Sequence, residues 1–190
     1  MRIIGGEHRG RRLVRWQDAD IRPLRDRVRT ALFDTLGEAV QGAEVLDLFA
    51  GTGAVALEAL SRGAARATLV DSSPKAVRII RANAAALGYR DRVEVLQGDG
   101  IRAVERLARQ GRRFDLVFVG TPYSLPELAT AALQALAAHA PLRPGAWVVV
   151  ETFHKEEPAD AFPPLRRVAS RAYGETRLTY FRFGGAEGER

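Results

Sequence analysis

The sequence has 190 residues, 46% of them hydrophobic, and contains no cysteine. This is enough chain for one domain with a proper core, and the lack of cysteine excludes a disulfide scaffold, a zinc–cysteine site and a thiol nucleophile. No apolar run approaches the roughly 18 residues of a membrane span, and the N-terminus lacks the apolar core of a signal peptide. We therefore expect a cytoplasmic protein that has no membrane partner and acts as a monomer.

The positive charge is concentrated at the N-terminus. The whole chain carries a net charge of +6, while residues 1–29 alone hold nine arginines and four acidic residues, a net +5. Such a basic stretch is typical of nucleic-acid binding because each phosphate contact releases counterions, although a solvated charged face has the same composition. The arginines predicted to contact a nucleic-acid backbone are Arg9, Arg11, Arg12, Arg22, Arg25 and Arg27.

The first predicted element is a hairpin, with extended runs at Arg2–Gly5 and Gly10–Val14 around glycines. An irregular basic segment then runs to Pro23. From Leu24 to Leu36, apolar residues recur every four positions, which predicts an amphipathic helix that Gly37 ends.

Strands and helices then alternate along the chain. The predicted strands are Glu44–Phe49, Ala67–Val70, Val93–Leu96, Phe114–Val119 and Trp147–Glu151, followed by a terminal pair at Leu165–Tyr173 and Thr176–Phe183. The predicted helices are Ala54–Ser61, Pro74–Leu87, Ile101–Arg109 and Leu125–Ala138. This order indicates an α/β fold of the Rossmann-like kind, with a seven-stranded, mostly parallel sheet that ends in an antiparallel hairpin.

We expect two parts in this chain. Residues 1–37 form a basic N-terminal extension of hairpin and helix, and residues 38–190 form the α/β domain that holds a small ligand. Ligands on such sheets bind at the carboxyl ends of the strands. The residues just after each strand are therefore the candidate site residues.

A glycine-rich loop follows the first predicted strand, in the segment Asp47-Leu48-Phe49-Ala50-Gly51-Thr52-Gly53. Its glycines allow a tight turn and a close approach of the backbone to a ligand. The segment Gly51–Ala56 also matches the G-x-G-x-x-A fingerprint of dinucleotide-binding proteins, with Asp71 at the position of the ribose-binding acid. The loop by itself therefore leaves two cofactors open, and with them a dinucleotide oxidoreductase as one function.

Acidic residues near three strand ends favour S-adenosylmethionine. Asp47 would repel a pyrophosphate but suits the sulfonium and ammonium groups of this methyl donor. Asp71 is placed to accept from ribose hydroxyls, and Asp99 from an adenine amino group, although either could simply cap a helix or a turn. The candidate cofactor-binding residues are Asp47, Phe49, Gly51, Gly53, Asp71, Ser72, Asp99 and Gly100.

The segment after the fourth strand resembles a catalytic motif. Amino-directed methyltransferases carry Asp/Asn-Pro-Pro-Tyr there, in which a side-chain oxygen and a main-chain carbonyl accept the amino hydrogens and the aromatic ring stacks on the base. Here Gly120 replaces the acid and Thr121 the first proline, so the predicted catalytic groups are the Thr121 carbonyl, Pro122 and Tyr123. Asp115 lies five residues earlier, about 16 Å along a strand, too far to replace the acid.

With these residues assembled, the sequence resembles the bacterial RsmD-type family, which methylates the N2 amino group of one guanine in 16S ribosomal RNA. The resemblance implies a class I methyltransferase fold, S-adenosylmethionine as cofactor, and ribosomal RNA or a small-subunit particle as partner, held by the N-terminal arginines. The segments that carry the resemblance are Arg2–Gly6, Arg9–Leu13, Ile21–Arg29, Ala31–Phe33, Asp47–Gly53, Glu58–Ala64 and Tyr173–Thr176.

Gly120 is the main departure from this family. Loss of a charged acceptor at a reacting amine costs roughly 3–4 kcal/mol by analogy with oxyanion-hole deletions, which leaves a slow enzyme. Alternatively, another residue substitutes for the acid, or the protein is an inactive homologue that serves in RNA binding or ribosome assembly. His8, His154 and residues 155–157 lack the spacing of metal ligands, so we expect no metal, and Glu151 has no assigned role.

Overall fold

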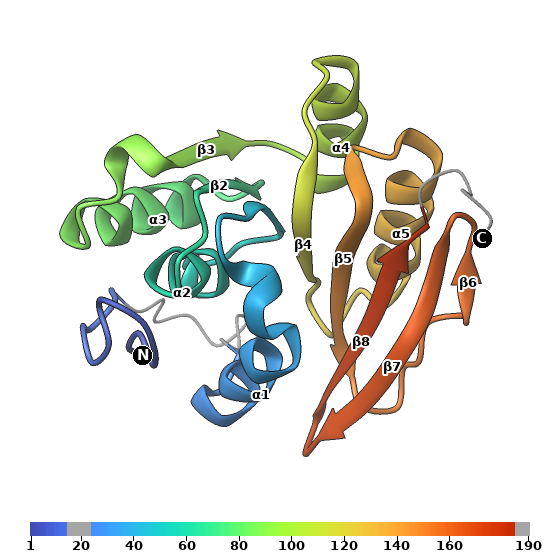
Figure 1. The fold of residues 1–190 in the computed structure, drawn as a ribbon, viewed down its shortest axis with the longest axis horizontal. Helices are drawn as coiled ribbons and strands as arrows, with labels where there is room; N and C mark the ends of the chain where they lie inside the picture. Colours follow the sequence, from blue (N-terminus) through green and yellow to red (C-terminus); the bar gives the residue numbers. More distant parts are fainter. Residues whose placement is uncertain (15–23, 185–190) are drawn as a thin grey trace.

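The computed structural model describes residues 1–14 and 24–184, which fold around one sheet of eight strands (Figure 1). The strand order is β3-β2-β1-β4-β5-β8-β7-β6. The first five strands in this order are parallel, and the last three are antiparallel. The strands are β1 Glu44–Leu48, β2 Arg66–Asp71, β3 Val93–Gln97, β4 Phe114–Gly120, β5 Leu142–Phe153, β6 Ala161–Phe162, β7 Leu165–Tyr173 and β8 Thr176–Phe183.

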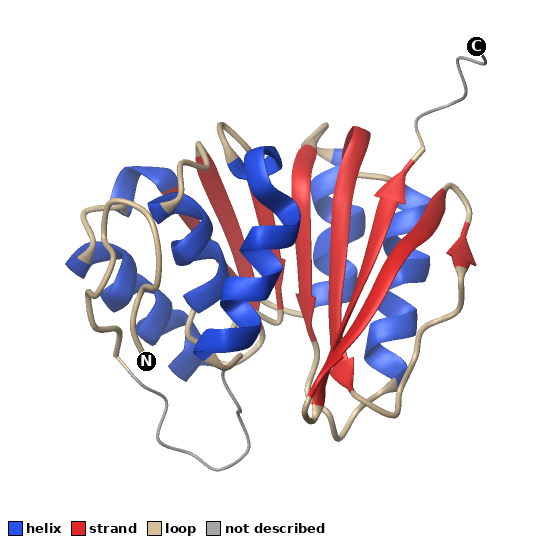
Figure 2. Cartoon of the chain, turned by 60° about the horizontal axis from the view of Figure 1, so that its bottom comes forward, coloured by secondary structure: helices blue, strands red, loops and turns tan. Residues whose placement is uncertain are grey.

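Five α-helices cover the two faces of this sheet (Figure 2). They are α1 Asp26–Leu36, α2 Ala54–Ser61, α3 Pro74–Ala86, α4 Gly100–Arg109 and α5 Glu127–His139, with short 3-10 turns at Gly37–Val40 and Arg90–Arg92. Apolar side chains of α1, α2 and α3 form one core with the sheet, and those of α4 and α5 form the other. The central strands β1 and β4 are therefore buried on both faces, which explains why most of their residues are apolar.

The predicted α/β fold and its terminal antiparallel hairpin are confirmed, and most element boundaries differ by no more than two residues; the following differences are of interest. The structure has an eighth strand, β6, whose two residues are too few to produce a pattern in the sequence. β5 begins at Leu142 rather than Trp147, because the register of β4 and β5 shifts there and accommodates Pro144 and Gly145. The first helix begins at Asp26, two residues later than predicted.

The expected N-terminal hairpin forms, with three backbone hydrogen bonds between its two runs, but these runs do not become full strands. The chain turns back as predicted, but only a single bridge joins Arg2 to Arg12. The backbone N–H groups of Ile4 and Gly5 instead donate to the carboxylate of Glu58 on α2, at 2.8 and 2.7 Å. A backbone group that is satisfied by a side chain is not available to a β ladder, which explains the absence of the strands.

Glu58 holds the N-terminal segment and α1 against α2. Its carboxylate is fully buried and also contacts the guanidinium groups of Arg29, itself fully buried, and Arg62, at 3.5 and 2.9 Å. Gly6 lies so close to α2 that a Cβ atom there would be 1.7 Å from the carbonyl oxygen of Ser61, so no other residue fits. The predicted division of the chain at residue 37 stays a prediction.

Within the described parts of the chain, no helix is both long and apolar enough to cross a membrane.

Candidate functional site

The site lies where the strand order reverses. From β1 the chain proceeds to β2 and β3 on one side of the sheet, while β4 pairs with β1 on the other side and continues to β5. Open α/β sheets bind ligands in the crevice at the carboxyl ends of the strands at such a reversal. A pocket is present at this position, lined by Leu24, Asp47, Phe49, Ala50, Gly51, Thr52, Ala54, Val55, Phe118, Gly120 and Glu151.

The glycine loop forms one wall of this pocket. Three of its residues, Phe49, Gly51 and Gly53, have positive φ angles of 62°, 58° and 76°. Phe49 is not a glycine, and such backbone strain gathers at ligand sites. The Phe49 ring packs against the first residue of α4, Gly100, where a Cβ atom would lie 3.0 Å from the ring. The structure thus brings these four predicted cofactor residues together.

Asp47 lies at the floor of the pocket, within β1. The residue is 2% exposed, and from the described parts of the chain its carboxylate accepts one hydrogen bond, from the backbone N–H of Ala56 at 3.3 Å. Burial raises the pKa of Asp47 to about 8, and the negative charges of Asp71 and Glu151 contribute in the same direction. A buried carboxylate with a single weak donor favours binding of a cationic ligand, because the ligand would supply the compensating positive charge that the protein itself does not provide.

The other two acids of the predicted set already have backbone partners. Asp71 ends β2 and accepts from the N–H groups of Gly51 and Ser73, at 2.8 and 2.9 Å, so it holds the glycine loop in place. Asp99 caps α4 by accepting from the N–H of Arg102 at 2.8 Å.

The three acids near the strand ends do not lie at one level of the sheet. Asp47 pairs with Leu69, two residues before Asp71, and therefore lies deeper in the sheet. The roles of Asp71, Asp99 and the exposed Ser72 as cofactor contacts stay predictions.

The predicted catalytic segment begins at Gly120, the last residue of β4. Thr121 is buried and Pro122 is exposed. The Tyr123 hydroxyl donates to Oε1 of Glu151 at 2.8 Å and lies 2.7 Å from the hydroxyl of Thr176. These contacts hold the tyrosine in position beside the pocket, and its predicted stacking on a base stays a prediction.

Asp115 lies at the opposite end of β4. There its carboxylate accepts from the N–H of Glu44 at 2.8 Å and from Arg143 at 2.6 Å. The structure therefore agrees with the sequence-based conclusion that Asp115 is too distant to replace an acid at position 120.

Glu151 is the residue at this site that sequence reasoning missed. It pairs with Gly120 across β4 and β5 and lines the same pocket as Asp47. Burial raises the pKa of Glu151 to about 7, while the hydrogen bond from Tyr123 lowers it. The sequence did contain an indication, because Glu151 is an acid near the carboxyl end of an apolar strand. The other candidate residues were selected by this same position, where ligands of such sheets bind.

The N-terminal arginines predicted to bind a nucleic acid are exposed where they are described. Arg9, Arg11, Arg12, Arg25 and Arg27 all face solvent, and Arg22 lies outside the described residues. Arg11 also donates to the carbonyl of Ala86 at 2.9 Å. Their contact with a nucleic acid stays a prediction.

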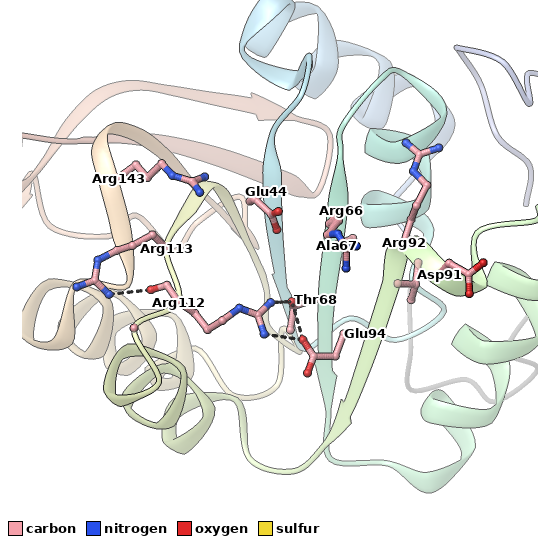
Figure 3. Close-up of a pocket in the computed structure, with 12 residues that line it drawn as sticks. Glu44, Arg66, Ala67, Thr68, Asp91, Arg92, Glu94, Arg112, Arg113 and Arg143 are labelled. Atoms are coloured by element: carbon pink, nitrogen blue, oxygen red, sulfur yellow. Dashed lines mark hydrogen bonds and ion pairs between the residues drawn. The ribbon is translucent and has the colours of Figure 1, made fainter.

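A larger hollow of about 550 Å³ lies at the amino ends of β1, β2 and β3 (Figure 3). Five arginines and three acidic residues line it; Arg112 contacts Glu94 at 2.8 Å, and Arg143 contacts Asp115, outside the lining, at 2.6 Å. Since the amino ends are the wrong end of a parallel sheet for ligand binding, this hollow is not the candidate site. Among residues 1–14 and 24–184, no group of three potential metal ligands is present.

Comparison with known proteins agrees with this assignment. A family model described as "Conserved hypothetical protein 95" matches residues 1–182. The Ribosomal RNA small subunit methyltransferase D of Escherichia coli is 40% identical over a match that spans 65% of this chain and 60% of that protein. Its namesake from Haemophilus influenzae is 33% identical over 83% of this chain and 81% of that protein.

Among solved structures, "Putative methyltransferase yhhF from Escherichia coli" superimposes with a TM-score of 0.83 and 29% identity, over 97% of this chain and 98% of that one. The sheet order, the glycine loop and this likeness define an α/β protein with the class I methyltransferase fold. The chain belongs to the family of conserved hypothetical protein 95, the RsmD family.

Proposed function

We propose that this protein transfers a methyl group from S-adenosylmethionine to the N2 amino group of a guanine in small-subunit ribosomal RNA. The observation that carries the proposal is the buried Asp47 carboxylate, which opens into the pocket at the strand reversal with almost no donor of its own. The names of the relatives support ribosomal RNA as the substrate. The comparisons give no support to an inactive RNA-binding homologue.

The residues around the pocket fit the methyl donor chemically. Asp47 would attract the ammonium and sulfonium charges, and the backbone of Gly51 and Gly53 would approach the ligand closely. Asp71 and Asp99 would accept from the ribose hydroxyls and the adenine amino group with their remaining lone pairs. When bound, the donor supplies a methyl group made electrophilic by the positive sulfur.

The RNA substrate would be held on the same side of the sheet as the methyl donor. Tyr123 would stack on the target base, the shape of the loop at Pro122 would admit it, and the carbonyl of Thr121 would accept one amino hydrogen. The exposed arginines of the N-terminal extension would contact the RNA backbone as bidentate phosphate ligands. These five described arginines are Arg9, Arg11, Arg12, Arg25 and Arg27.

The test is incubation of the protein with tritiated methyl donor and undermethylated small-subunit RNA or particles, followed by digestion to nucleosides. We expect label in N2-methylguanosine, and far less label with Asp47→Asn. Alanine at Arg9, Arg11 and Arg12 together should weaken RNA binding and reduce its salt dependence by about one counterion per lost phosphate contact. Tight binding of NAD without binding of the methyl donor would overturn the proposal.

A further inference from the structure

We propose that Glu151 is a catalytic residue that replaces the acid missing at position 120: its carboxylate accepts a hydrogen from the target amino group during methyl transfer. This inference rests on the proposed function. It explains how a chain that lacks the acidic residue of its catalytic motif can still activate an amino group.

The first argument is position in the sheet. Gly120 and Glu151 are directly paired across the parallel strands β4 and β5. Paired residues on neighbouring strands point to the same face. Two residues earlier, Phe118 pairs with both Asp47 and Val149, so the side chains of Asp47 and Glu151 lie on one face, the one that α1, α2 and α3 cover.

The second argument is distance. A Cβ atom built on Gly120 would lie 3.8 Å from Oε2 of Glu151. The carboxylate oxygens of an aspartate extend roughly 2.4 Å beyond its Cβ, so an acid at position 120 and the actual Glu151 would direct oxygen atoms into the same small region. The longer glutamate side chain thus reaches, from the next strand, the space that the glycine leaves open.

The third argument is orientation. Tyr123 donates to Oε1 of Glu151, and the Tyr123 hydroxyl is in turn held by Thr176. Among residues 1–14 and 24–184, no group donates a hydrogen bond to Oε2 of Glu151. Glu151 as a whole is only 8% exposed. One oxygen is therefore anchored while the other faces the pocket as an acceptor. An acceptor in this position costs little reorganisation when the substrate amino group arrives.

The chemistry balances with the groups named. As the bond between the methyl carbon and the amino nitrogen forms, the bond from that carbon to the donor sulfur breaks, and its electron pair stays on sulfur. The positive charge moves to the amino group, which loses one proton to the Glu151 carboxylate. Glu151 then releases this proton to solvent. With a pKa of about 7, Glu151 can accept and release a proton near neutral pH.

The experiment compares four proteins in the tritium assay: wild type, Glu151→Gln, Gly120→Asp and the double variant. We expect Glu151→Gln to lower kcat by about 10² to 10³, the loss typical of one charged or oriented acceptor. Binding of S-adenosylmethionine, measured by calorimetry, should change by less than threefold. In the double variant, the carboxylate introduced by Gly120→Asp should restore at least a tenth of the wild-type kcat.

Gly120→Asp alone should not raise kcat by more than threefold, because it adds a second acceptor beside the one already present. The new Cβ would lie 3.0 Å from the edge of the Phe118 ring, a contact that a small ring movement relieves. The pH profile gives a further readout: wild-type kcat should rise through about pH 7, and Glu151→Gln should lose this rise. The titratable groups facing Glu151 are Asp47 from β1 and Tyr123.

Asp115→Asn is the matched control, because it removes the acid of β4, at the end of the strand opposite Gly120, and should leave kcat unchanged. Thermal unfolding of each variant separates loss of fold from loss of chemistry. Wild-type kcat in Glu151→Gln, or a hundredfold gain in Gly120→Asp alone, would overturn this inference and leave the proposed function standing. If the wild-type protein methylates no RNA, the proposed function fails and the inference fails with it.

Discussion

Two regions of this molecule bury carboxylates in opposite ways. At the N-terminal segment, the fully buried Glu58 is surrounded by donors: two backbone N–H groups and the guanidinium groups of Arg29 and Arg62. At the carboxyl edge of the sheet, Asp47 has one backbone donor and Glu151 has one hydroxyl donor. Burial alone therefore does not separate these two kinds of acid, whereas the number of donors around each carboxylate does.

The difference has energetic consequences. A buried carboxylate that is fully hydrogen-bonded and paired holds its neighbours together, and removing it leaves the partners unsatisfied. A buried carboxylate with few donors destabilises the free protein, and that cost is recovered only when a ligand provides the missing interactions. The predictions below test whether this contrast holds.

The largest effect is expected at Glu58. Glu58→Gln removes the charge that compensates the buried Arg29 and turns an amide N–H₂ group toward other donors. We expect the free energy of unfolding to fall by about 3–5 kcal/mol, measured with urea. Glu105→Gln breaks an exposed pair with Arg109 and serves as the control, with an expected loss below about 1 kcal/mol. Equal losses in the two variants would contradict the structural role of Glu58.

Asp47→Asn should weaken ligand binding, in contrast to Glu58→Gln, which should weaken folding. It keeps the shape of the site but removes the group that can ionise against a bound cation, so the affinity for S-adenosylmethionine should fall by about 30- to 100-fold, which corresponds to roughly 2–3 kcal/mol. Isothermal titration calorimetry measures this directly. A variant that binds the donor as tightly as the wild type would show that Asp47 is not its counter-charge.

The pH dependence of stability gives a third test. Because the pKa of Asp47 is raised to about 8 in the folded protein, the native state holds its proton where the unfolded state has lost it. The contribution of Asp47 to the free energy of unfolding therefore falls as the pH rises from about 4 to 8. We expect the difference in unfolding free energy to shift in favour of Asp47→Asn over this range, by up to about 1.4 kcal/mol per pH unit. Urea unfolding at pH 5 and pH 8 measures it, and a constant difference would refute it.

The smallest effect is expected at Tyr123. Tyr123→Phe removes the hydrogen bond that lowers the pKa of Glu151, so this pKa should move further upward. The expected loss of stability is about 0.5–1.5 kcal/mol, the ordinary value of one hydrogen bond. Carbon-13 NMR of labelled glutamate side chains follows the titration of Glu151. A downward shift would show that the tyrosine does not stabilise the ionised form.

Much of the fold followed from sequence patterns. The boundaries of α2, β7 and β8 agree with those predicted, because each element is followed within two residues by a glycine that ends it. The N-terminal hairpin forms but pairs over a shorter length than predicted, because nothing near Ile4 and Gly5 in the sequence shows that Glu58, more than fifty residues away, takes their N–H groups. Local patterns cannot report a partner that only folding brings close.

The sequence by itself determined the class of this protein: the alternation of strands and helices, the glycine loop with Asp47, and the loss of the acid at Gly120. Only the tertiary structure decided which acids are available to a ligand. It gave the carboxylate oxygens of Asp71 and Asp99 backbone partners and placed Glu151 beside Gly120. The physical reason is that hydrogen-bond satisfaction and pairing across strands are properties of neighbours in space, which the order of residues along the chain does not specify.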